Sequence, residues 1–249
     1  TWGDANHGGD SSSVQDQLRG VQQIHATHSA FAAILKDGSV VTWGHPHDGG
    51  DSLAVQAQLR GVHQIQSAIS AFAAILEDGS VVTWGRAAFG GDSSAVQDQL
   101  KGVHQIQAAN RAFAAIPEDG SVVSWGDAVY GGGDSSAVQH QLRGVQQIQA
   151  SYNAFAAILE DGSVVTWGHP HFGGDSSAVQ HQLRGVQQIH ATHQAFAAIL
   201  ADGSVVTWGH ADHGGDSSAV QDQLKGVQQI QATHTAFAAI LKDGSVVSW

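Results

Sequence analysis

The chain has 249 residues, with 10 Lys and Arg against 22 Asp and Glu, which gives a formal net charge of −12. This acidic balance disfavours binding to nucleic acid or to anionic membrane surfaces, because both need clustered cations. Cysteine is absent, so disulfides, thiolate metal sites and cysteine nucleophiles are excluded. No apolar run is long enough to cross a bilayer as a helix.

One stretch, AFAAILKDGSVVTWG at residues 30–44, recurs along the whole chain. A fixed period of about 41 residues indicates a repeat architecture, and one such unit cannot bury its own apolar face. We therefore expect a single domain over residues 1–249. Its repeats span residues 2–42, 43–83, 84–124, 125–166, 167–207 and 208–249. The chain opens within a repeat and holds no methionine, so we expect it to be a processed or excised piece.

The pattern within each repeat predicts four short strands, because runs rich in valine, isoleucine, threonine and aromatic residues are separated by glycine-rich breaks. In the first copy the expected strands are Ser12–Val14, Val21–Thr27, Phe31–Leu35 and Val40–Trp43. Between the last two, Asp37-Gly38 predicts a tight hairpin in which both turn residues have positive φ. A stack of helix pairs of similar repeat length is the alternative. The 31 glycines make it the poorer fit, since glycine weakens helix interiors.

Four antiparallel strands per repeat are typical of a blade in a β-propeller, a ring of small sheets. The sequence therefore predicts an all-β, six-bladed propeller. The chain stops at the end of a third strand, whereas its first residues supply an outer strand without a blade. We expect the ring to close by pairing of Asp10–Val14 with Gly244–Trp249.

The repeated pattern resembles that of the regulator of chromosome condensation family. It consists of a Gly-Val strand, an alanine-rich strand, Asp-Gly and then Val-Val-x-Trp-Gly. In the first copy these are Gly20-Val21, Phe31–Leu35, Asp37-Gly38 and Val40–Gly44. The short period is similar to that of the compact bacterial β-lactamase inhibitor of this fold. The resemblance implies a β-propeller, of seven blades in most members, that acts by binding other proteins. The long inserted loops of the nucleotide-exchange factor have no counterpart here, so its activity is not carried over.

The repeats differ from one another mainly in two segments. We name the first the post-tryptophan segments, at residues 4–7, 45–48, 86–89, 127–130, 169–172 and 210–213. We name the second the inner-loop pairs, at residues 28–29, 69–70, 110–111, 152–153, 193–194 and 234–235. In an antiparallel blade both kinds of segment emerge at the same face, opposite the Asp-Gly turns and the QLRG connections. Rigid scaffolds present function on loops, so the variable face is the predicted binding face.

Aromatic and arginine residues dominate the energetics of protein interfaces. The predicted partner-binding residues are therefore Arg86, Phe89, Arg111, Tyr130, Tyr152 and Phe172. No nucleophile elbow, phosphate-binding loop or dinucleotide-binding glycine pattern is present, and the Gly-Gly-Asp segments lack the lysine that a phosphate loop needs. The sequence favours a non-enzymatic protein that binds a protein partner or a second copy of itself.

Histidines in the variable segments suggest an alternative, because neutral imidazole binds zinc, copper or nickel. They lie in repeats five, six, one and two, which are neighbours in a closed ring. The candidate ligands are His7, His28, His45, His47, His169, His171, His193, His210, His213 and His234. His28, His193 and His234 share one repeat position and could converge on one ion with water as a fourth ligand, in a site that could be hydrolytic. A binding face that responds to pH is a further option.

Overall fold

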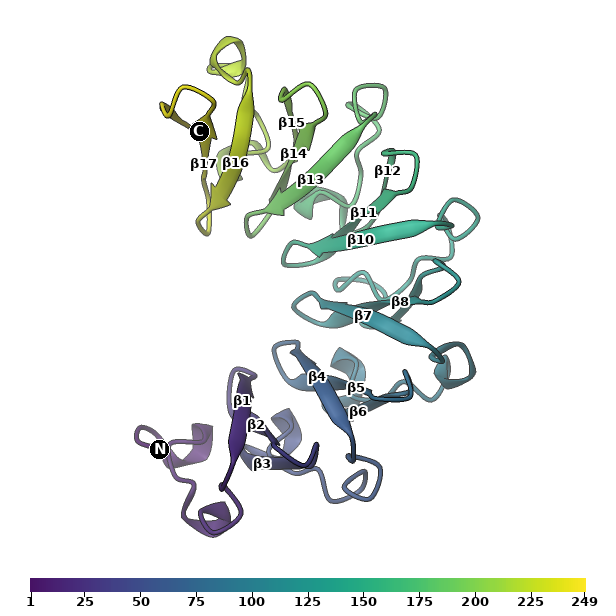
Figure 1. Cartoon of the computed structure of the whole chain (residues 1–249), viewed down its shortest axis with the longest axis vertical. Coiled ribbons are helices and arrows are strands. Elements are labelled where there is room, and N and C mark those ends of the chain that lie inside the picture. Colours follow the sequence, from purple (N-terminus) through teal and green to yellow (C-terminus); the bar gives the residue numbers. More distant parts are fainter. The chain divides into compact units, whose positions relative to one another are not determined.

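The computed structural model describes residues 1–249 and contains six three-stranded antiparallel sheets (Figure 1). The first three sheets are β1 Val21–Ala26, β2 Ala30–Leu35, β3 Val40–Gly44; β4 Val62–Ser67, β5 Ala71–Leu76, β6 Val81–Gly85; and β7 Val103–Ala108, β8 Ala112–Pro117, β9 Val123–Gly126. The other three are β10 Val145–Ala150, β11 Ala154–Leu159, β12 Val164–Gly168; β13 Val186–Ala191, β14 Ala195–Leu200, β15 Val205–Gly209; and β16 Val227–Ala232, β17 Phe237–Leu241, β18 Val246–Ser248.

The only helices are single turns of 3-10 helix, and none could span a membrane. They are η1 Ala5–His7, η2 Ser12–Val14, η3 Pro46–Asp48, η4 Ala87–Phe89, η5 Gln97–Gln99, η6 Pro170–Phe172, η7 Ala211–His213 and η8 Gln221–Gln223.

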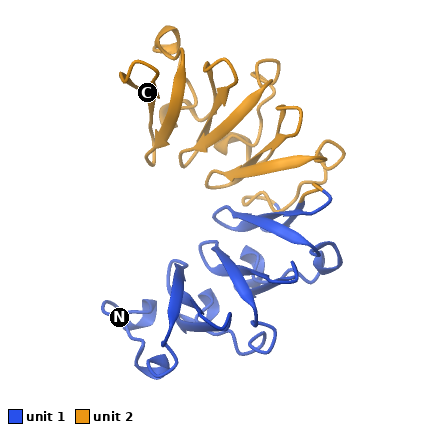
Figure 2. Ribbon diagram, viewed as in Figure 1, with its two compact units in different colours: residues 1–119, 123–128 blue, residues 120–122, 129–249 orange.

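The chain divides into two compact units, coloured blue and orange in Figure 2. Unit 1 comprises residues 1–119 and 123–128 and holds the first three sheets. Unit 2 comprises residues 120–122 and 129–249 and holds the last three. The organisation of residues 1–249 as a single domain stays a prediction.

The Asp-Gly hairpins are confirmed, but their turn type differs from the one predicted. No residue other than glycine has positive φ, so Asp37 stays in the ordinary region and only Gly38, at φ 74°, is left-handed. The Gly38 amide donates to the Leu35 carbonyl, and the Leu35 amide donates to the Ser39 carbonyl. This is a longer loop in which glycine follows the turn. The Asp37 carboxylate accepts from both the amide and the hydroxyl of Ser39, at 3.0 and 2.6 Å, and these bonds hold the turn in place.

Each sheet has three strands, one fewer than the four that the sequence predicts. Ser12–Val14 forms the 3-10 helix η2, and the equivalent segments of the later repeats are turns. The reason is local capping: the Asp10 carboxylate accepts the Ser12 amide at 2.8 Å, and the Asp51 carboxylate accepts the Leu53 amide at 2.9 Å. Such bonds favour a turn over a strand.

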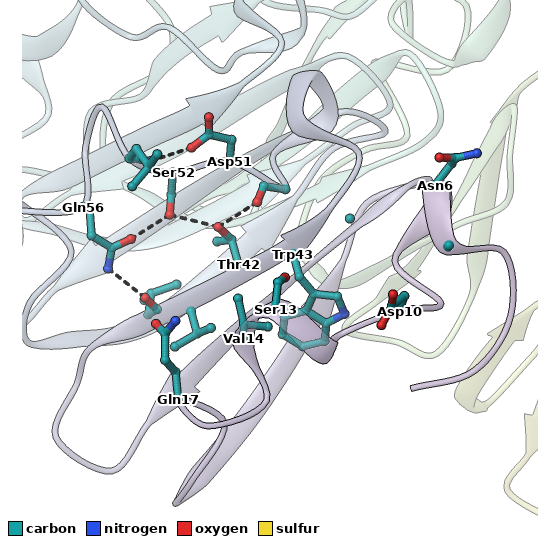
Figure 3. A pocket seen from close by; sticks show the side chains of 16 residues that line it. Asn6, Asp10, Ser13, Val14, Gln17, Thr42, Trp43, Asp51, Ser52 and Gln56 are labelled. Carbon is teal, nitrogen blue, oxygen red and sulfur yellow. Dashed lines mark hydrogen bonds between the residues drawn. The ribbon is translucent and has the colours of Figure 1, made fainter.

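Side chains replace the missing strand at the outer edge of β3 (Figure 3). The Gln56 side-chain amide donates to the Val40 carbonyl at 2.9 Å, and the Ser52 hydroxyl donates to the Gln56 side-chain oxygen at 2.8 Å. The Thr42 hydroxyl lies 2.9 Å from the Ser52 hydroxyl and donates to the Gly50 carbonyl at 3.1 Å. These bonds satisfy edge groups that an exposed strand would offer to another chain.

Neighbouring sheets pack through small and branched apolar side chains. Ala32 and Ile34 of the first sheet meet Ile65, Phe72 and Trp84 of the second. Within each sheet a phenylalanine and a tryptophan stack as a cross-strand pair, as in Phe72 and Trp84 at a ring separation of 5.1 Å. The Trp84 indole N–H donates to the Gly49 carbonyl at 3.1 Å, so the buried polar atom is satisfied.

Within its own unit, the first sheet and the last sheet each have one apolar face that is buried at the equivalent positions of other sheets. Ile24 of β1 is 58% exposed, whereas Ile65 at the same repeat position is 0% exposed. Val246 of β18 is 64% exposed, whereas its equivalent Val205 is 1% exposed. These two faces correspond to the two halves of the sheet-to-sheet interface that is buried elsewhere in each unit.

Candidate binding surface formed by the variable loops

The post-tryptophan segments share one backbone geometry although their side chains differ. In five of the six repeats the segment forms a single 3-10 turn, and a glycine with positive φ ends it. Gly49, at φ 100°, follows η3, and a Cβ there would lie 2.6 Å from a ring carbon of Phe72. Glycine is therefore required on both conformational and steric grounds. The constant ends hold the three residues of the turn in place and leave their side chains free to vary.

Main-chain hydrogen bonds hold the two kinds of variable segment together. The His45 amide donates to the Ser29 carbonyl at 2.8 Å, and the Thr27 hydroxyl donates to the Asp48 carbonyl at 3.0 Å. In unit 2 the His169 amide donates to the Asn153 carbonyl at 2.9 Å, and the Thr192 hydroxyl reaches the carbonyl of the η7 residue His213 at 2.8 Å. The prediction that both segments lie on one face is confirmed within each unit.

Main-chain hydrogen bonds also join the constant segments, which are the Asp-Gly turns and the QLRG connections. The Lys36 amide donates to the Gly20 carbonyl at 3.0 Å, and the Val62 amide donates to the Gly38 carbonyl at 2.9 Å. Each hairpin turn is thus joined to its own connection and to that of the next repeat. Within each unit, one side carries conserved repeat chemistry and the other carries the variable side chains.

Unit 1 brings three of the predicted partner-binding residues into one cluster. The guanidinium carbons of Arg86 and Arg111 lie 5.2 and 4.8 Å from the centre of the Phe89 ring. Arg86 also contacts the carboxylate of Asp48 at 3.1 Å, and Arg111 lies 3.7 Å from that of Asp127. The two carboxylates fix the guanidinium groups over the ring, and the arginine side chains remain 40 to 48% exposed. Sequence reasoning missed both aspartates, because each arginine belongs to a different segment from its partner.

Unit 2 brings three rings from successive inner-loop pairs into a stack. The centre of the Tyr152 ring lies 3.8 Å from that of His193, and His193 lies 4.1 Å from His234. The spacing follows from the backbone, because the Tyr152 amide donates to the His193 carbonyl and the His193 amide donates to the His234 carbonyl, both at 3.0 Å. Two post-tryptophan residues border the stack: Phe172 lies 6.2 Å and His213 lies 6.4 Å from the His193 ring. We name these five residues the ring ladder.

The ring ladder disfavours a protonated His193. Burial lowers the pKa of this imidazole, and the nearby His234 and His213 lower it further. Desolvation and like charge both act against the cationic form. With its own pKa lowered in this way, His193 is neutral near pH 7 unless a negative group is brought to it.

The remaining candidate residues are distributed between the units. Tyr130 is 55% exposed, and its ring lies 6.3 Å from that of His169. In unit 1, His7 lies 6.2 Å from His28 between ring centres, and His45 lies 5.9 Å from His47. No three His, Cys, Asp or Glu side chains are grouped in a way that could hold a metal ion. His28 belongs to unit 1, whereas His193 and His234 belong to unit 2.

A groove of about 470 Å³ in unit 1 contains none of the residues of these clusters, and Figure 3 shows the side chains that line it. Asn6, Asp10, Val14 and Trp43 are among the residues that line it. A similar groove of about 420 Å³ recurs one repeat later, between β6 and the segment around Asp92. Because the part of the lining that recurs in both grooves is the shared scaffold, we regard this groove as a consequence of the repeat rather than as a specific site.

Comparisons with solved structures identify the fold. Two crystal structures of Prp20, the RCC1 protein of Saccharomyces cerevisiae, align with 96% of this chain and with 71% and 73% of their own, both at a TM-score of 0.57. The chain has an RCC1-like β-propeller fold. Each three-stranded sheet is thus a propeller blade. The sequence identity to Prp20 is only 16% and 15% in the two alignments.

The same fold also occurs in the ectodomain of a receptor kinase. The ectodomain of the receptor kinase CR4 from Physcomitrella patens aligns at a TM-score of 0.51 and 16% identity, over 88% of this chain and 60% of its own. No family model matches the sequence of this propeller, and no curated protein matches it. The likeness therefore concerns the fold alone.

Proposed function

We propose that this propeller is a non-enzymatic binding protein that presents its variable loops to a protein partner or to a second copy of itself. The supporting observation is that main-chain hydrogen bonds gather the variable segments on one side of each unit, while their side chains differ from repeat to repeat. A solved relative of this fold supports the idea: Prp20 is seen bound to Kap60, and its binding to Gsp1p and histones has been studied.

Two anchors of different chemistry carry the proposal. In unit 1 the Phe89 ring with its two arginines offers a flat surface whose guanidinium groups are held in place by carboxylates. In unit 2 the half-buried Tyr152 and Phe172 offer rigid aromatic surface. Rigid aromatic and arginine side chains lose little conformational freedom on binding and are enriched at interface hot spots.

The test is capture of partners from the source cells on the immobilised chain. We expect Phe89→Ala and Tyr130→Ala each to weaken capture of the same partner, with a loss on the order of tenfold or more in affinity for a hot-spot residue. Arg60→Ala, in the connection on the constant side, is the matched control and should bind as the parent does. Equal binding by parent and both aromatic variants, with circular dichroism showing them folded, would refute the proposal.

We also propose that the propeller closes by contact between its first and last blades. In the first repeat the Ser11 hydroxyl donates to the Gln15 side-chain oxygen at 3.1 Å. Ser52 and Gln56, at the same positions of the next repeat, form the same bond, and Gln56 caps β3 by donating to the Val40 carbonyl. Docked on β18, Gln15 would cap the Val246 carbonyl. Closure would also bring the exposed Ile24 face against the Val246 face. Side-chain capping replaces the strand pairing expected from the sequence, because residues 12–14 form a 3-10 turn.

Binding of zinc, copper or nickel by the loop histidines stays a prediction, and no grouping of ligands in the structure supports it. Elemental analysis of protein purified without a histidine tag tests it directly. A stoichiometric metal that is lost in His193→Asn would support a site at the ring ladder.

A further inference from the structure

A row of rings runs along the variable side of unit 2. Tyr130 lies 6.3 Å from His169 between ring centres, and His169 lies 5.2 Å from Phe172. Phe172 in turn lies 6.0 Å from Tyr152, whose ring stacks on that of His193 at 3.8 Å. We name these five residues the aromatic row. They come from the fourth and fifth repeats and from both kinds of variable segment.

The variable segments that form the aromatic row contain no Asp, Glu, Lys or Arg. They read Val-Tyr at residues 129–130, Tyr-Asn at 152–153, His-Pro-His-Phe at 169–172 and His-Gln at 193–194. In the remaining variable segments of unit 2, Asp212 on η7 is the one residue of these four types. A charged segment of a partner would give up its water at the row without gaining a counter-ion, which costs free energy. The row therefore favours an uncharged segment.

The rings of the row are rigid and still accessible. Tyr130 is 55% exposed and the adjoining Val129 is 69% exposed. Tyr152, Phe172 and His193 are half-buried, so packing holds each ring on one side and leaves part of it in solvent. Rigid aromatic rings supply large contact area with little loss of conformational freedom on binding.

The modes by which proteins recognise peptides differ in the surface that they require. Addition of a strand requires an open sheet edge, whereas the row is built from loops and the 3-10 turn η6. An acidic or phosphorylated segment requires clustered arginines, and the row has none. A docked helix inserts its anchors into an apolar groove, whereas the row offers a succession of flat rings. Surfaces lined by aromatic rings are typical of sites that bind polyproline II segments.

We propose that the aromatic row binds a proline-rich segment of a partner protein in the polyproline II conformation. The proline rings pack against the aromatic rings of the row. The Tyr152 hydroxyl donates to a carbonyl of the segment, because a polyproline II segment makes no internal hydrogen bonds. Such a segment is extended before it binds, so docking costs it little conformational entropy. This inference rests on the proposed function, since it specifies the chemistry of the partner.

The chain itself does not supply a segment of this kind. Its three prolines, Pro46, Pro117 and Pro170, are far apart in the sequence, and Pro117 belongs to β8. A second copy of these 249 residues is therefore not the occupant of the row. About six residues of polyproline II extend over roughly 19 Å, which is enough to contact several rings.

The test uses the whole chain and a fluorescein-labelled decaproline peptide, with anisotropy measured at about pH 8, where ordinary imidazoles are neutral. Oligoglutamate, oligolysine and an uncharged amphipathic helical peptide of equal length are the comparison probes. Tyr152→Ala removes the ring and the hydroxyl, whereas Tyr152→Phe removes the hydroxyl alone. The control is His190→Gln, on β13 of the fifth repeat and outside the row, where Gln149 stands one repeat earlier.

Saturable binding of decaproline by the parent and by His190→Gln, without binding of the charged peptides, is the expected result. Tyr152→Ala should weaken this binding about tenfold, as for a hot-spot ring. Tyr152→Phe should weaken it about fivefold, the value for one hydrogen bond. Tyr130→Ala should also weaken binding, and because Tyr130 is exposed, this variant decides the matter if Tyr152→Ala does not fold.

Three results would overturn the inference. They are no saturation up to about 1 mM decaproline, equal affinity of the parent and the tyrosine variants, or tighter binding of a helical or charged peptide. A cellular partner captured through Phe89 and Tyr130, by a chain that does not bind decaproline, would refute this inference and leave the proposed function standing. Failure of both capture and peptide binding would refute both.

Discussion

Ile24 and Ile65 occupy the same repeat position and form a natural pair for testing closure. Replacing isoleucine by alanine removes three carbon atoms, and full burial is worth about 0.8 kcal/mol for each. Ile65 is 0% exposed, so Ile65→Ala loses this transfer term and leaves a cavity as well. We expect its cost in unfolding free energy to be about 2 to 5 kcal/mol.

The expected cost at Ile24 depends on whether its face is covered in solution. With 58% of its surface exposed, less than half of the transfer term is at stake and no closed cavity forms, so Ile24→Ala would cost about 1 kcal/mol. If the last blade covers this face, the cost rises to that of Ile65→Ala. We expect the higher value, because closure is proposed.

Urea unfolding followed by tryptophan fluorescence measures both values, provided that the variants share the parent's m-value. A cost near 1 kcal/mol at Ile24 beside a large cost at Ile65 would refute closure. Equal, small costs at both positions would refute the reasoning about burial itself. Size-exclusion chromatography of the parent then separates closure within one chain from contact between two copies.

Three further outcomes follow from the scaffold. Gly49→Ala should destabilise by about 3 kcal/mol or more, because its Cβ meets a ring carbon of Phe72 at 2.6 Å. Gly185→Ala, also at positive φ but with only an ordinary contact to the Ala201 Cβ at 3.8 Å, should lose about 1 kcal/mol, and thermal unfolding compares the two variants. Gln56→Ala uncaps the Val40 carbonyl and should cost about 1 kcal/mol in urea unfolding, and unchanged stability would show that water replaces the amide. Hydrogen bonds from serine hydroxyls and amides lower the pKa of the hairpin-turn aspartates in the folded chain. The folding stability that these carboxylates contribute is therefore present above the unfolded pKa of about 3.9 and is lost as the pH falls below it. Stability measured from pH 6 to pH 3 should drop near and below that value, and a flat profile would contradict this reasoning.

Much of the fold could be predicted from the repeated strand pattern. Val21–Thr27, Phe31–Leu35 and Val40–Trp43 were expected as strands, and the structure has Val21–Ala26, Ala30–Leu35 and Val40–Gly44. Branched residues that alternate between glycines favour a strand over a helix. The same pattern recurs in all six repeats, so each expected boundary is indicated six times. The outer strand could not be predicted in the same way, because Ser12–Val14 suits either a strand or a turn. The decision comes from side-chain caps such as Asp10.

The candidate site was predictable as a set of positions but not as an arrangement of side chains. Comparison of the repeats placed His193 and His234 at one repeat position, yet the distance between their rings depends on the spacing of adjacent blades. The pairing of Arg86 with Asp48 likewise joins two segments of different repeats. Neither contact has a local signal in the sequence, because each arises only when one blade packs against the next.

The way in which the loops are held explains how one scaffold can carry different surfaces. The bonds that fix each variable segment involve main-chain amides and carbonyls, together with hydroxyls and glycines at constant positions. The side chains at residues 86–89 or 169–172 are therefore not required for the loop backbone, and exchange between repeats should leave stability nearly unchanged. Asp48 and Asp127 are exceptions, since their carboxylates fix Arg86 and Arg111. A surface built in this way can change its partner without changing its fold, because specificity and stability depend on different atoms.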